Sequence, residues 1–439
     1  MTSASATGYR AGLSWKTRRL LGRVSLLGWL SGALAAVIVE HLLGRGLALR
    51  LGLGSIPLLF GVTDILRQPL MIPSTSVYVL LVYLLPIALV ASVTAPALNR
   101  VAGRLLGMST WLSIITHLAI AYTVLDLWCA LNDYRLLIVK LMLVAVMITL
   151  SLNIVNGYMG EFCCSHPGFM ALGAYSSSVF TVLFFVDDDV FGAALLPPAL
   201  APFLFPLALL AGGLVAAAGA LAVAIPSFRT RGDYLAVISL AFTFIVKSFI
   251  ENLEIIGGPR GFMSQPDLAS LPVVFAWTVI CMAVINNYVR STLGKALNAV
   301  RDDETAANAM TVDTRHTKMT AFLFSAFWAG VAGGLFAHIM RYVNPATFGV
   351  QKLAEVLAML YFGGLNSVIG SVVGAVGFTL FSEALRPLEI YKWVIIPVLL
   401  ILIMMFRPTG LLGFRDFDVR KTLSPRDIRE RGGRTVASG

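Results

Sequence analysis

Charged residues are scarce in this chain of 439 residues: Asp, Glu, Lys and Arg together make up 13% of it, whereas hydrophobic residues make up 58%. Soluble globular domains usually carry about 25% charged residues. With a mean hydropathy of +0.83, the chain lacks the polar surface that a water-soluble globule needs to cover its core. The composition therefore argues against a soluble enzyme and indicates a protein that crosses the bilayer several times.

Cysteine is also rare, and Cys129, Cys163, Cys164 and Cys281 do not have the spacing of a metal site. They lie in or beside apolar stretches, where cysteine acts as a small hydrophobic residue. We therefore predict neither a disulfide framework nor a metal site, and we assign no catalytic residue.

No polar stretch is long enough to form a soluble catalytic domain, since the longest ones are the two tails and a few loops. The chain also lacks a G-x-x-x-x-G-K-[ST] phosphate loop. The glycine-rich stretch GGPRGFMSQ at 257–265 does not have the Lys-Ser/Thr ending of such a loop. If ATP drives this protein, another chain must hydrolyse it.

Long apolar runs, in contrast, recur along the whole sequence. A bilayer core about 30 Å thick needs about 20 apolar residues per helix. The sequence therefore predicts an all-α polytopic membrane protein with about 12 transmembrane helices, within a range of about 10–12. The predicted spans are 22–42, 75–95, 109–131, 137–157, 168–186, 203–225, 234–253, 272–289, 319–341, 352–364, 367–385 and 391–406.

The positions of Lys and Arg predict the orientation, because short cytoplasmic loops retain these residues. With an even number of spans, four basic stretches and the C-terminal tail fall on one side, so we predict that both termini are cytoplasmic. The acidic residues Asp187 to Asp189 fall on the other side. Arg45, Arg50 and Arg67 are exceptions, which we place in a long external loop. The basic residues on the cytoplasmic side are Arg10, Lys16, Arg18, Arg19, Arg100, Arg104, Arg229, Arg231, Arg290, Lys295, Arg301, Arg315, Lys318, Arg415, Arg420, Lys421, Arg426, Arg429, Arg431 and Arg434.

The net charge of +10 needs no nucleic acid to explain it. A basic tail beside anionic lipid headgroups is the simpler account. Membrane lipid is therefore an expected partner, and nucleic acid is not.

The first apolar run allows two interpretations. Residues Ala33 to Ala35 follow a basic start and an apolar stretch, as a signal-peptidase site does. The apolar run continues through Val39, which favours a retained membrane anchor.

One short stretch, VRDDETAANAMTVD at 300–313, is charged and alanine-rich. Asp302 or Asp303 can cap a helix by accepting backbone N–H bonds, and acids favour the positive end of the helix dipole. The alanines that follow have high helix propensity and small side chains that let a partner's backbone approach. A helix this short is marginal alone, so we expect it to dock in a groove. The alternative is a solvated helix that stabilises its own loop.

Four stretches of the chain resemble a known family, in unchanged order. Residues 293–335, LGKALNAVRDDETAANAMTVDTRHTKMTAFLFSAFWAGVAGGL, resemble the cytoplasmic loop and following span of M-type permeases in the branched-chain amino acid family of ABC importers. LNIVNGYMGEFCCSHPGFMALGAY (152–175), RGDYLAVISLAF (231–242) with IGGPRGF (256–262), and FRPTGLLG (406–413) are similar to other segments of that family. The resemblance covers about 137–415.

The resemblance implies how the chain is organised. It implies an ABC-importer permease core over 136–415 with a cytoplasmic coupling loop at 290–318. Residues 1–135 would form an N-terminal extension with about three extra spans, and 416–439 a basic cytoplasmic tail. In the family, the loop carries a coupling helix that enters a cleft on the ATPase subunit. The positions that match this helix are Arg301, Asp302, Asp303, Glu304, Ala306, Ala307 and Ala309.

The resemblance also implies partners and location. The chain would be a transport subunit and not an enzyme, in a bacterial inner membrane. It would work with two ATPase subunits, a second and non-identical permease, and an extracytoplasmic substrate-binding protein. ATP and magnesium are then expected on the ATPase partner, with no cofactor on this chain.

The sequence departs from the family pattern at several positions. Thr311 replaces the glycine that commonly follows the coupling helix, which makes a left-handed cap less easy. Thr243-Phe244 replaces a Gly-Glu pair inside the seventh span, and Cys163-Cys164 and Arg260 also differ from the commoner residues. Branched-chain amino acids remain the expected substrates, and urea, short amides or another small organic solute are the alternative.

Polar side chains within the best-matched segment are candidates for the substrate pathway, because polar groups in a bilayer are costly and often functional. Nearby glycines allow the backbone to break there, as it does at transporter midplane sites. Glu161 and His166 are favoured as a titratable pair. The alternative is that these groups form helix-helix hydrogen bonds. The full set is Asn153, Asn156, Glu161, Ser165 and His166.

Two other classes of protein remain open. An ion-coupled secondary carrier needs a relay of membrane-embedded acids, and this chain has few such groups. A membrane-embedded enzyme needs a clustered catalytic set, for which His166 with Glu161 is the sole indication. The coupling-type loop favours the importer over both.

Overall fold

The computed structural model describes residues 24–53, 56–58, 71–188, 190–228, 234–407, 409–414 and 417–424. Within these ranges the secondary structure is helical, apart from two isolated β-bridges, Asp188 with Gly192 and Phe262 with Val343. Part of the evidence for orientation lies outside the described residues, namely Arg10, Lys16, Arg18, Arg19, Arg67, Asp189, Arg229, Arg231, Arg415 and the tail from 425 onward.

The chain divides into two compact units, Met1–Leu136 with Asp418–Gly439, and Leu137–Phe417. In the first unit, α2 packs against α5 and α6. Gly32 permits the contact with α5, because a Cβ there would lie 2.9 Å from the backbone oxygen of Ile87. The helices of this unit are α2 (Leu26–Arg50), α4 (Ile72–Val79), the π-helix η3 (Leu80–Leu84), α5 (Leu85–Met108), α6 (Thr110–Cys129) and α18 (Val419–Leu423).

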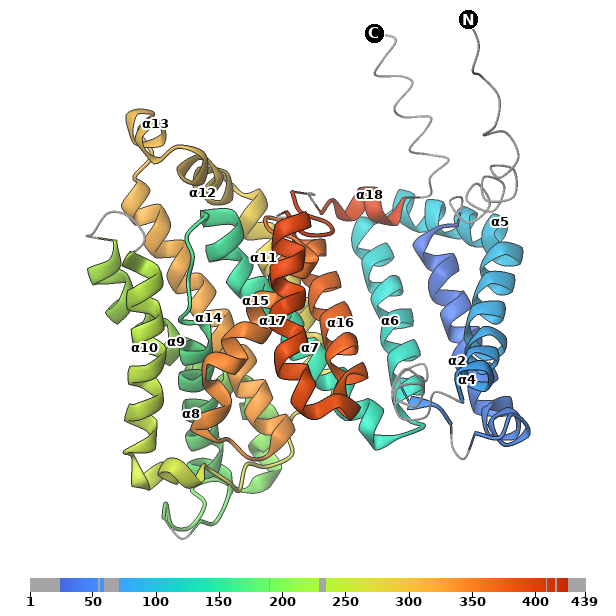
Figure 1. Cartoon of the computed structure of the whole chain (residues 1–439), viewed down its shortest axis with the longest axis horizontal. Coiled ribbons are helices and arrows are strands. Elements are labelled where there is room, and N and C mark those ends of the chain that lie inside the picture. The colour runs from blue at the N-terminus through green and yellow to red at the C-terminus, as the bar shows by residue number, and fades with distance from the viewer. Residues whose placement is uncertain are drawn as a thin grey trace, which may run out of the picture. The chain divides into compact units, whose positions relative to one another are not determined.

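The second unit contains the remaining helices (Figure 1). They are α7 (Asp133–Asn153), which begins in the first unit, η4 (Ile154–Met159), α8 (His166–Phe185), η5 (Pro198–Leu200), α9 (Ala201–Ser227), α10 (Tyr234–Glu251), η6 (Glu254–Ile256), η7 (Gly258–Arg260), α11 (Leu271–Arg290), α12 (Thr292–Asp302), α13 (Glu304–Ala309), α14 (Thr314–Met340), η8 (Pro345–Phe348), α15 (Val350–Gly363), α16 (Val368–Ala384), η9 (Arg386–Leu388) and α17 (Glu389–Phe406).

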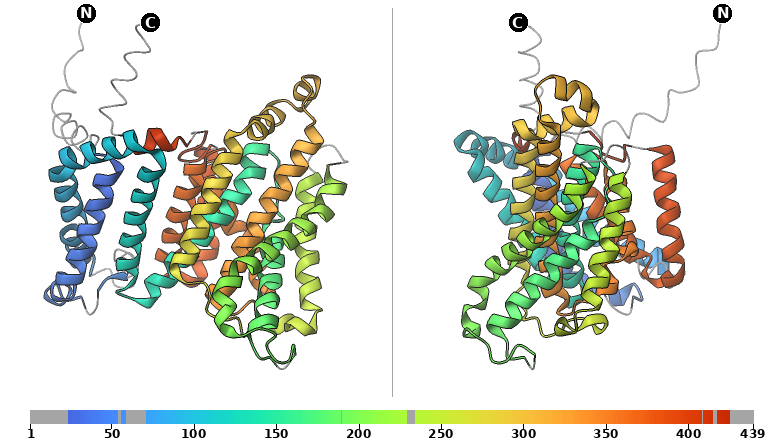
Figure 2. Two further views of the ribbon diagram at one scale, coloured as in Figure 1. Left: turned by 180° about the vertical axis from the view of Figure 1, so that it is seen from behind. Right: turned by 90° about the vertical axis from the view of Figure 1, so that its left-hand side faces the viewer.

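The helices α8, α9 and α14 pack most closely, and Figure 2 shows α14 beside both of the others. Small residues make this possible: a Cβ added at Gly173 would collide with the backbone of Gly330, and one at Gly333 would collide with the Met170 carbonyl. Close approach of backbones through small residues is the usual way in which membrane helices associate. The same device joins α15 to α16, where a Cβ at Gly374 would collide with the Met359 carbonyl.

Eight helices among the described residues are long and apolar enough to cross a membrane. The number is nine if Leu235–Glu251 and Glu254–Arg260, which are bent by 84°, count as one span. Val368–Ala384 and Val394–Phe406 are shorter apolar helices. The all-helical, multi-pass architecture is therefore confirmed, while the count of about 12 spans and the cytoplasmic location of both termini stay predictions.

The prediction was wrong for Arg45 and Arg50, which we placed in a long loop. Both lie in α2, which continues to Arg50. The helix extends past the apolar run because HLLGRGLALR contains mainly good helix formers. Gly52, two residues after the helix end, has a left-handed φ of 74°, and the Leu53 N–H bonds to the Ala48 carbonyl at 2.9 Å, as in a Schellman ending.

Candidate functional site

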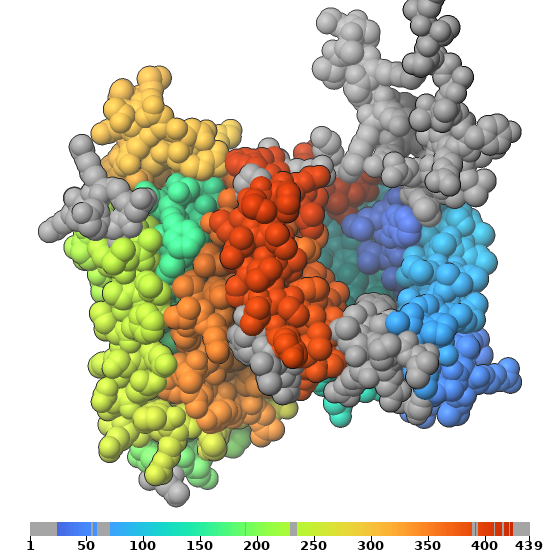
Figure 3. Space-filling view, viewed as in Figure 1, coloured from blue at the N-terminus to red at the C-terminus, as the bar shows by residue number. Residues whose placement is uncertain are grey.

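The charged stretch at 300–313 forms the end of one helix and the whole of the next. α12 ends at Asp302, and α13 spans the six residues Glu304–Ala309. Asp303 caps α13, since its Oδ1 accepts a 2.9 Å hydrogen bond from the Ala306 N–H. The predicted capping role is confirmed for Asp303, whereas Asp302 pairs with its neighbour Arg301 at 2.7 Å. In Figure 3 the segment forms a projection at one end of the second unit.

Lys318, on the first turns of α14, holds α13 in place. Its Nζ lies 2.8 Å from Glu304 Oε2 on α13 and 2.7 Å from Glu161 Oε1. The Lys318 side chain is only 11% exposed. Water therefore screens its attraction to the two carboxylates only in part. A helix of six residues is not stable alone, and this ion pair supplies part of its tertiary support.

Arg301 connects α12 to the π-helical end of the preceding span. Its Nη1 donates to the Gly157 carbonyl at 3.5 Å, and its side chain packs on Gly160. The guanidinium also lies over the Phe414 ring, 5.4 Å from the ring centroid. Phe414 follows the FRPTGLLG motif, whose backbone returns to the α15–α16 turn through the bond from the Leu412 N–H to the Gly363 carbonyl at 2.9 Å.

The two faces of α13 differ. Asp303, Ala306 and Ala309 are exposed, and Met310 is 76% exposed, whereas Ala307 is buried at 6%. Ala307 therefore packs within the chain, which changes the expectation that it faces a partner. Every residue of α13 except Ala307 is exposed, and the acidic residues Asp303 and Glu304 stand at its start.

Thr311 follows Met310, the C-cap of α13, and has a φ of 69°. Glycine usually takes this left-handed position after a helix, and here a β-branched residue takes it. Such a conformation is strained for any residue with a branched Cβ. The Val312 N–H nevertheless bonds to the Ala307 carbonyl at 3.1 Å and closes the helix.

The span of α7 and η4 is followed by a break, residues 160–165, that has no regular structure. Gly160 starts it with φ of 77°, and the chain then runs beside α14 to the start of α8 (Figure 1). The Glu161 N–H donates to the Val155 carbonyl at 3.2 Å, and the Cys163 N–H donates to Asn156 Oδ1 at 3.2 Å. Irregular backbone within a membrane protein is tolerated where such partners exist.

Two side chains of α10 complete the hydrogen bonding of the break. Ser239 Oγ accepts from the Cys164 N–H at 2.9 Å, and the Thr243 hydroxyl donates to the Cys164 carbonyl at 2.9 Å. Thr243 belongs to the Thr243-Phe244 pair, at which the sequence departs from the expected Gly-Glu pattern. It serves here as a partner for the broken backbone.

His166 begins α8 and is fully buried. Its Nε2 lies 2.8 Å from the Ser325 hydroxyl, which donates its one hydrogen to the Ser151 carbonyl at 2.6 Å. His166 Nε2 must therefore be the donor in this contact, and Nδ1 faces Cys163 Sγ at 3.8 Å. This arrangement links α8 to α7 and α14.

The other predicted pathway residues also have protein partners. Asn153 Nδ2 donates to the Ser367 carbonyl at 3.0 Å and to Ser371 Oγ at 2.7 Å, and its Oδ1 accepts from the Asn366 N–H at 3.0 Å. Ser165 Oγ lies 3.0 Å from Cys163 Sγ. Asn156 Nδ2, in contrast, is buried without a hydrogen-bond partner.

Glu161 and His166 do not act as a pair in this arrangement. Glu161 joins Lys318 and thereby the α13 end, while His166 bonds to Ser325. In the sequence, Lys318 stands out only as one of the basic residues of the loop. The one feature that could have singled it out is its position at the start of an apolar run. A role in substrate transport stays a prediction for all five pathway residues.

The described residues contain no group of three His, Cys, Asp or Glu side chains placed to hold a metal ion. The four cysteines are buried and form no disulfide with one another.

Comparison with known proteins supports one family. The model of the branched-chain amino acid transport system / permease component family matches residues 134–405. The high-affinity branched-chain amino acid transport system permease protein LivM of Escherichia coli is 31% identical over an alignment of 310 residues, and the match covers 63% of this chain and 69% of that protein. LivM of Salmonella typhimurium has the same identity and coverage.

A second type of permease from these systems is also similar. The permease protein LivH of Salmonella typhimurium is 27% identical over 170 residues, which are 38% of this chain and 54% of that protein. No solved structure matches the chain. The family match covers α7 through nearly all of α17, and so includes the capped helix α13, Lys318 and the broken span. The chain therefore belongs to the permease family of branched-chain amino acid transport systems.

Proposed function

We propose that this chain is a permease subunit of an ATP-driven importer for branched-chain or related amino acids in a bacterial inner membrane. It works with a second, non-identical permease, two ATPase subunits and an extracytoplasmic substrate-binding protein. The existence of LivM and LivH as separate permease proteins among the relatives supports the second permease.

One observation carries the proposal: a lysine at the base of α14 joins the projecting helix α13 to the broken span. Lys318 contacts Glu304 on α13 at 2.8 Å and Glu161 in the break at 2.7 Å. A force on the exposed face of α13 therefore acts, through one side chain, on the segment between η4 and α8. This is the arrangement that a coupling element requires.

The mechanism follows from this connection. ATP-driven closure of the ATPases moves α13, and Lys318 and Arg301 transmit the movement to η4 and to residues 160–165. The break has few regular backbone bonds, so it changes conformation at lower cost than a continuous helix. Coupling of this kind is a free-energy link between two sites, so substrate and nucleotide must influence each other's binding reciprocally.

The proposal is tested by purification in mild detergent followed by reconstitution. The importer should co-purify with ATPase subunits and should move leucine into vesicles only with ATP. Leucine transport by the isolated chain, driven by an ion gradient and without ATPases, would identify a secondary carrier instead. Uptake of urea or acetamide in preference to leucine would assign the same complex to the alternative substrate class.

Orientation is tested separately with single cysteines. The four native cysteines are buried, so an introduced thiol should dominate labelling by a membrane-impermeant maleimide. A cysteine at Asp188 should react from outside intact cells, and one at Asn308 only after permeabilisation. Outside labelling at Asn308 would overturn the orientation and the coupling role together.

A further inference from the structure

A cavity lies between α7, α15 and α16, on the side of Lys352 near the start of α15 and of Glu383 near the end of α16, remote from α13. Its volume is about 140 Å³, and its walls come from α7, α8, α14, α15 and α16. With α13 in the cytoplasm, as the proposed function requires, this end belongs to the outer half of the membrane. A substrate delivered from outside would meet it first.

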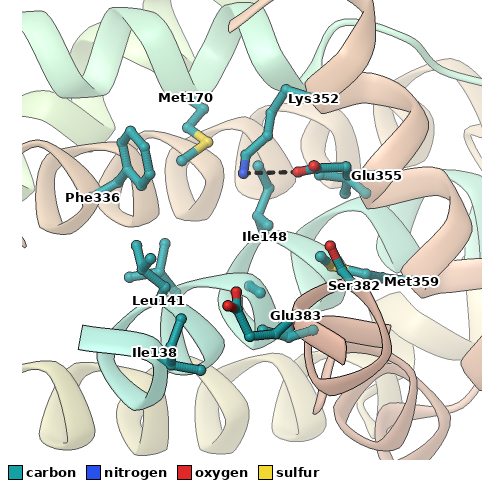
Figure 4. Close-up of a pocket in the computed structure, with 14 residues that line it drawn as sticks. Ile138, Leu141, Ile148, Met170, Phe336, Lys352, Glu355, Met359, Ser382 and Glu383 are labelled. Carbon is teal, nitrogen blue, oxygen red and sulfur yellow. Dashed lines mark hydrogen bonds and ion pairs between the residues drawn. The ribbon is translucent and has the colours of Figure 1, made fainter. Parts of the chain in front are cut away.

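Most of the cavity wall is aliphatic or aromatic. Ile138, Leu141 and Ile148 line it from α7, and Met170 and Phe336 line it from α8 and α14 (Figure 4). An apolar cavity of about 150 Å³ suffices for a molecule as large as benzene. The volume therefore suits a branched aliphatic side chain.

Three charged side chains line the same cavity. Lys352 Nζ lies 3.3 Å from Glu355 Oε2 and 5.5 Å from the centroid of the Phe336 ring. The Glu383 carboxylate lies across the cavity from this pair in Figure 4 and contacts Arg386 at 3.1 Å. The exposed fractions of Lys352, Glu355 and Glu383 are 21%, 20% and 15%, so all three can meet a solute from water.

Thr379 adds a polar atom without a partner. Its Oγ1 is buried and makes no hydrogen bond, although the residue lines the cavity. Several other helical hydroxyls of this unit donate to the carbonyl four residues earlier, for example Thr149 to Ala145 at 2.7 Å and Ser177 to Gly173 at 2.7 Å. A buried polar atom that forgoes this bond costs free energy, which a bound polar group would recover.

We propose that this cavity binds the transported amino acid as a zwitterion, with its carboxylate on Lys352, its ammonium group between Glu355 and Glu383, and its branched side chain against Leu141, Ile148 and Phe336. The inference rests on the proposed function and names the binding site that this function needs. A cationic group, two carboxylates and an apolar wall around one small volume match the three parts of such a substrate. Neither a sugar nor an inorganic ion would use all three.

The cavity is tested by substrate protection of an introduced cysteine, in the complete permease–ATPase complex. Ser382 lines the cavity, and a Ser382→Cys thiol should react with a methanethiosulfonate reagent. Leucine should slow this reaction, and leucinamide, which lacks the carboxylate, should slow it much less. The control is a cysteine at Glu254, an exposed residue outside the cavity, where leucine should have no effect.

Charge variants in the Ser382→Cys background assign the contacts. Lys352→Met should raise the leucine concentration needed for protection by about tenfold, since it removes a charge-assisted hydrogen bond. Lys247→Met, which breaks the pair with Glu251 at 3.7 Å on α10, should change nothing. If Lys352→Met misfolds, Glu383→Gln serves instead. It should weaken protection by leucine and leave that by isocaproate, which is leucine without its amino group, unchanged.

The outcomes separate the cavity from the function. If the complex imports leucine with ATP but leucine does not protect the Ser382→Cys thiol, the cavity assignment is wrong and the proposed function stands. Equal protection by leucine and leucinamide would also overturn the assignment of Lys352. If the complex imports no amino acid, the proposed function fails, and the inference fails with it.

Discussion

Lys318 Nζ lies 2.7 Å from Glu161 Oε1, so the base of α14 is joined to the broken segment that precedes α8. The same ammonium group contacts Glu304 on α13 at 2.8 Å. The side chain of Glu161 is 27% exposed and that of Glu304 is 52% exposed. The contact with Glu161 is therefore less screened by water than the contact with α13.

This difference predicts an order of effects. Glu304→Gln should weaken the attachment of α13 by about 0–1 kcal/mol, which is what an exposed ion pair contributes. It should therefore lower coupling modestly. Lys318→Met should have a larger effect, because it also leaves the Glu161 carboxylate without its partner. The measurement is ATP hydrolysed per leucine transported in reconstituted complexes. Equal coupling in the Lys318→Met variant and the unmodified complex would contradict the proposed transmission through this side chain.

The faces of α13 predict opposite results for two neighbouring alanines. Ala306 is exposed, so Ala306→Gln should leave the permease folded and weaken ATPase association by overpacking the docked contact, at about 1–3 kcal/mol. Ala307 is buried, so Ala307→Gln should instead lower the thermal stability of the permease itself. Ala299→Gln, at an exposed position of α12, is the matched control. Normal ATPase binding and transport by the Ala306→Gln variant would show that α13 does not couple the subunits.

Thr311 predicts a stabilising substitution. Its φ of 69° costs a residue with a Cβ about 1–2 kcal/mol relative to glycine. Thr311→Gly should therefore raise the melting temperature of the purified permease. The greater conformational freedom of glycine in the unfolded chain should offset part of this gain. Thr311→Ala, which keeps the Cβ, should give a smaller gain. A lower melting temperature for the glycine variant would mean that the threonine side chain stabilises this turn.

The first unit contains a buried ion pair that predicts a rescue. Arg135 Nη2 lies 2.8 Å from Glu40 Oε1, and the two side chains are 1% and 0% exposed. Arg135 also lies over the Trp128 ring at 4.8 Å. Glu40→Leu should destabilise this unit by about 3–5 kcal/mol, because an uncompensated charge remains buried.

The double variant Glu40→Leu with Arg135→Met should recover most of that loss, since a buried ion pair is often replaceable by apolar residues. Thermal unfolding of the purified chain in detergent measures both variants. A double variant no more stable than the single one would mean that Arg135 has a structural role beyond neutralising Glu40.

The polytopic architecture and the family could be predicted from the sequence, because the length of apolar runs and the order of motifs are read along the chain. The same holds for the cap of α13, since Asp303 bonds to an N–H three residues away. The predicted end of α2 came too early in the chain. Hydropathy shows where the apolar run ends, and the helix can continue beyond that point.

The sequence by itself determined the class of protein, its family and the capped helix, all of which depend on local patterns. The tertiary structure alone decided that Glu161 joins Lys318 and not His166, because this contact unites residues 157 positions apart. It likewise decided which alanine of α13 is buried. Lys352 and Glu383 line the same cavity as Leu141. This cavity arises from the packing of separate helices, which no periodicity in the sequence reveals.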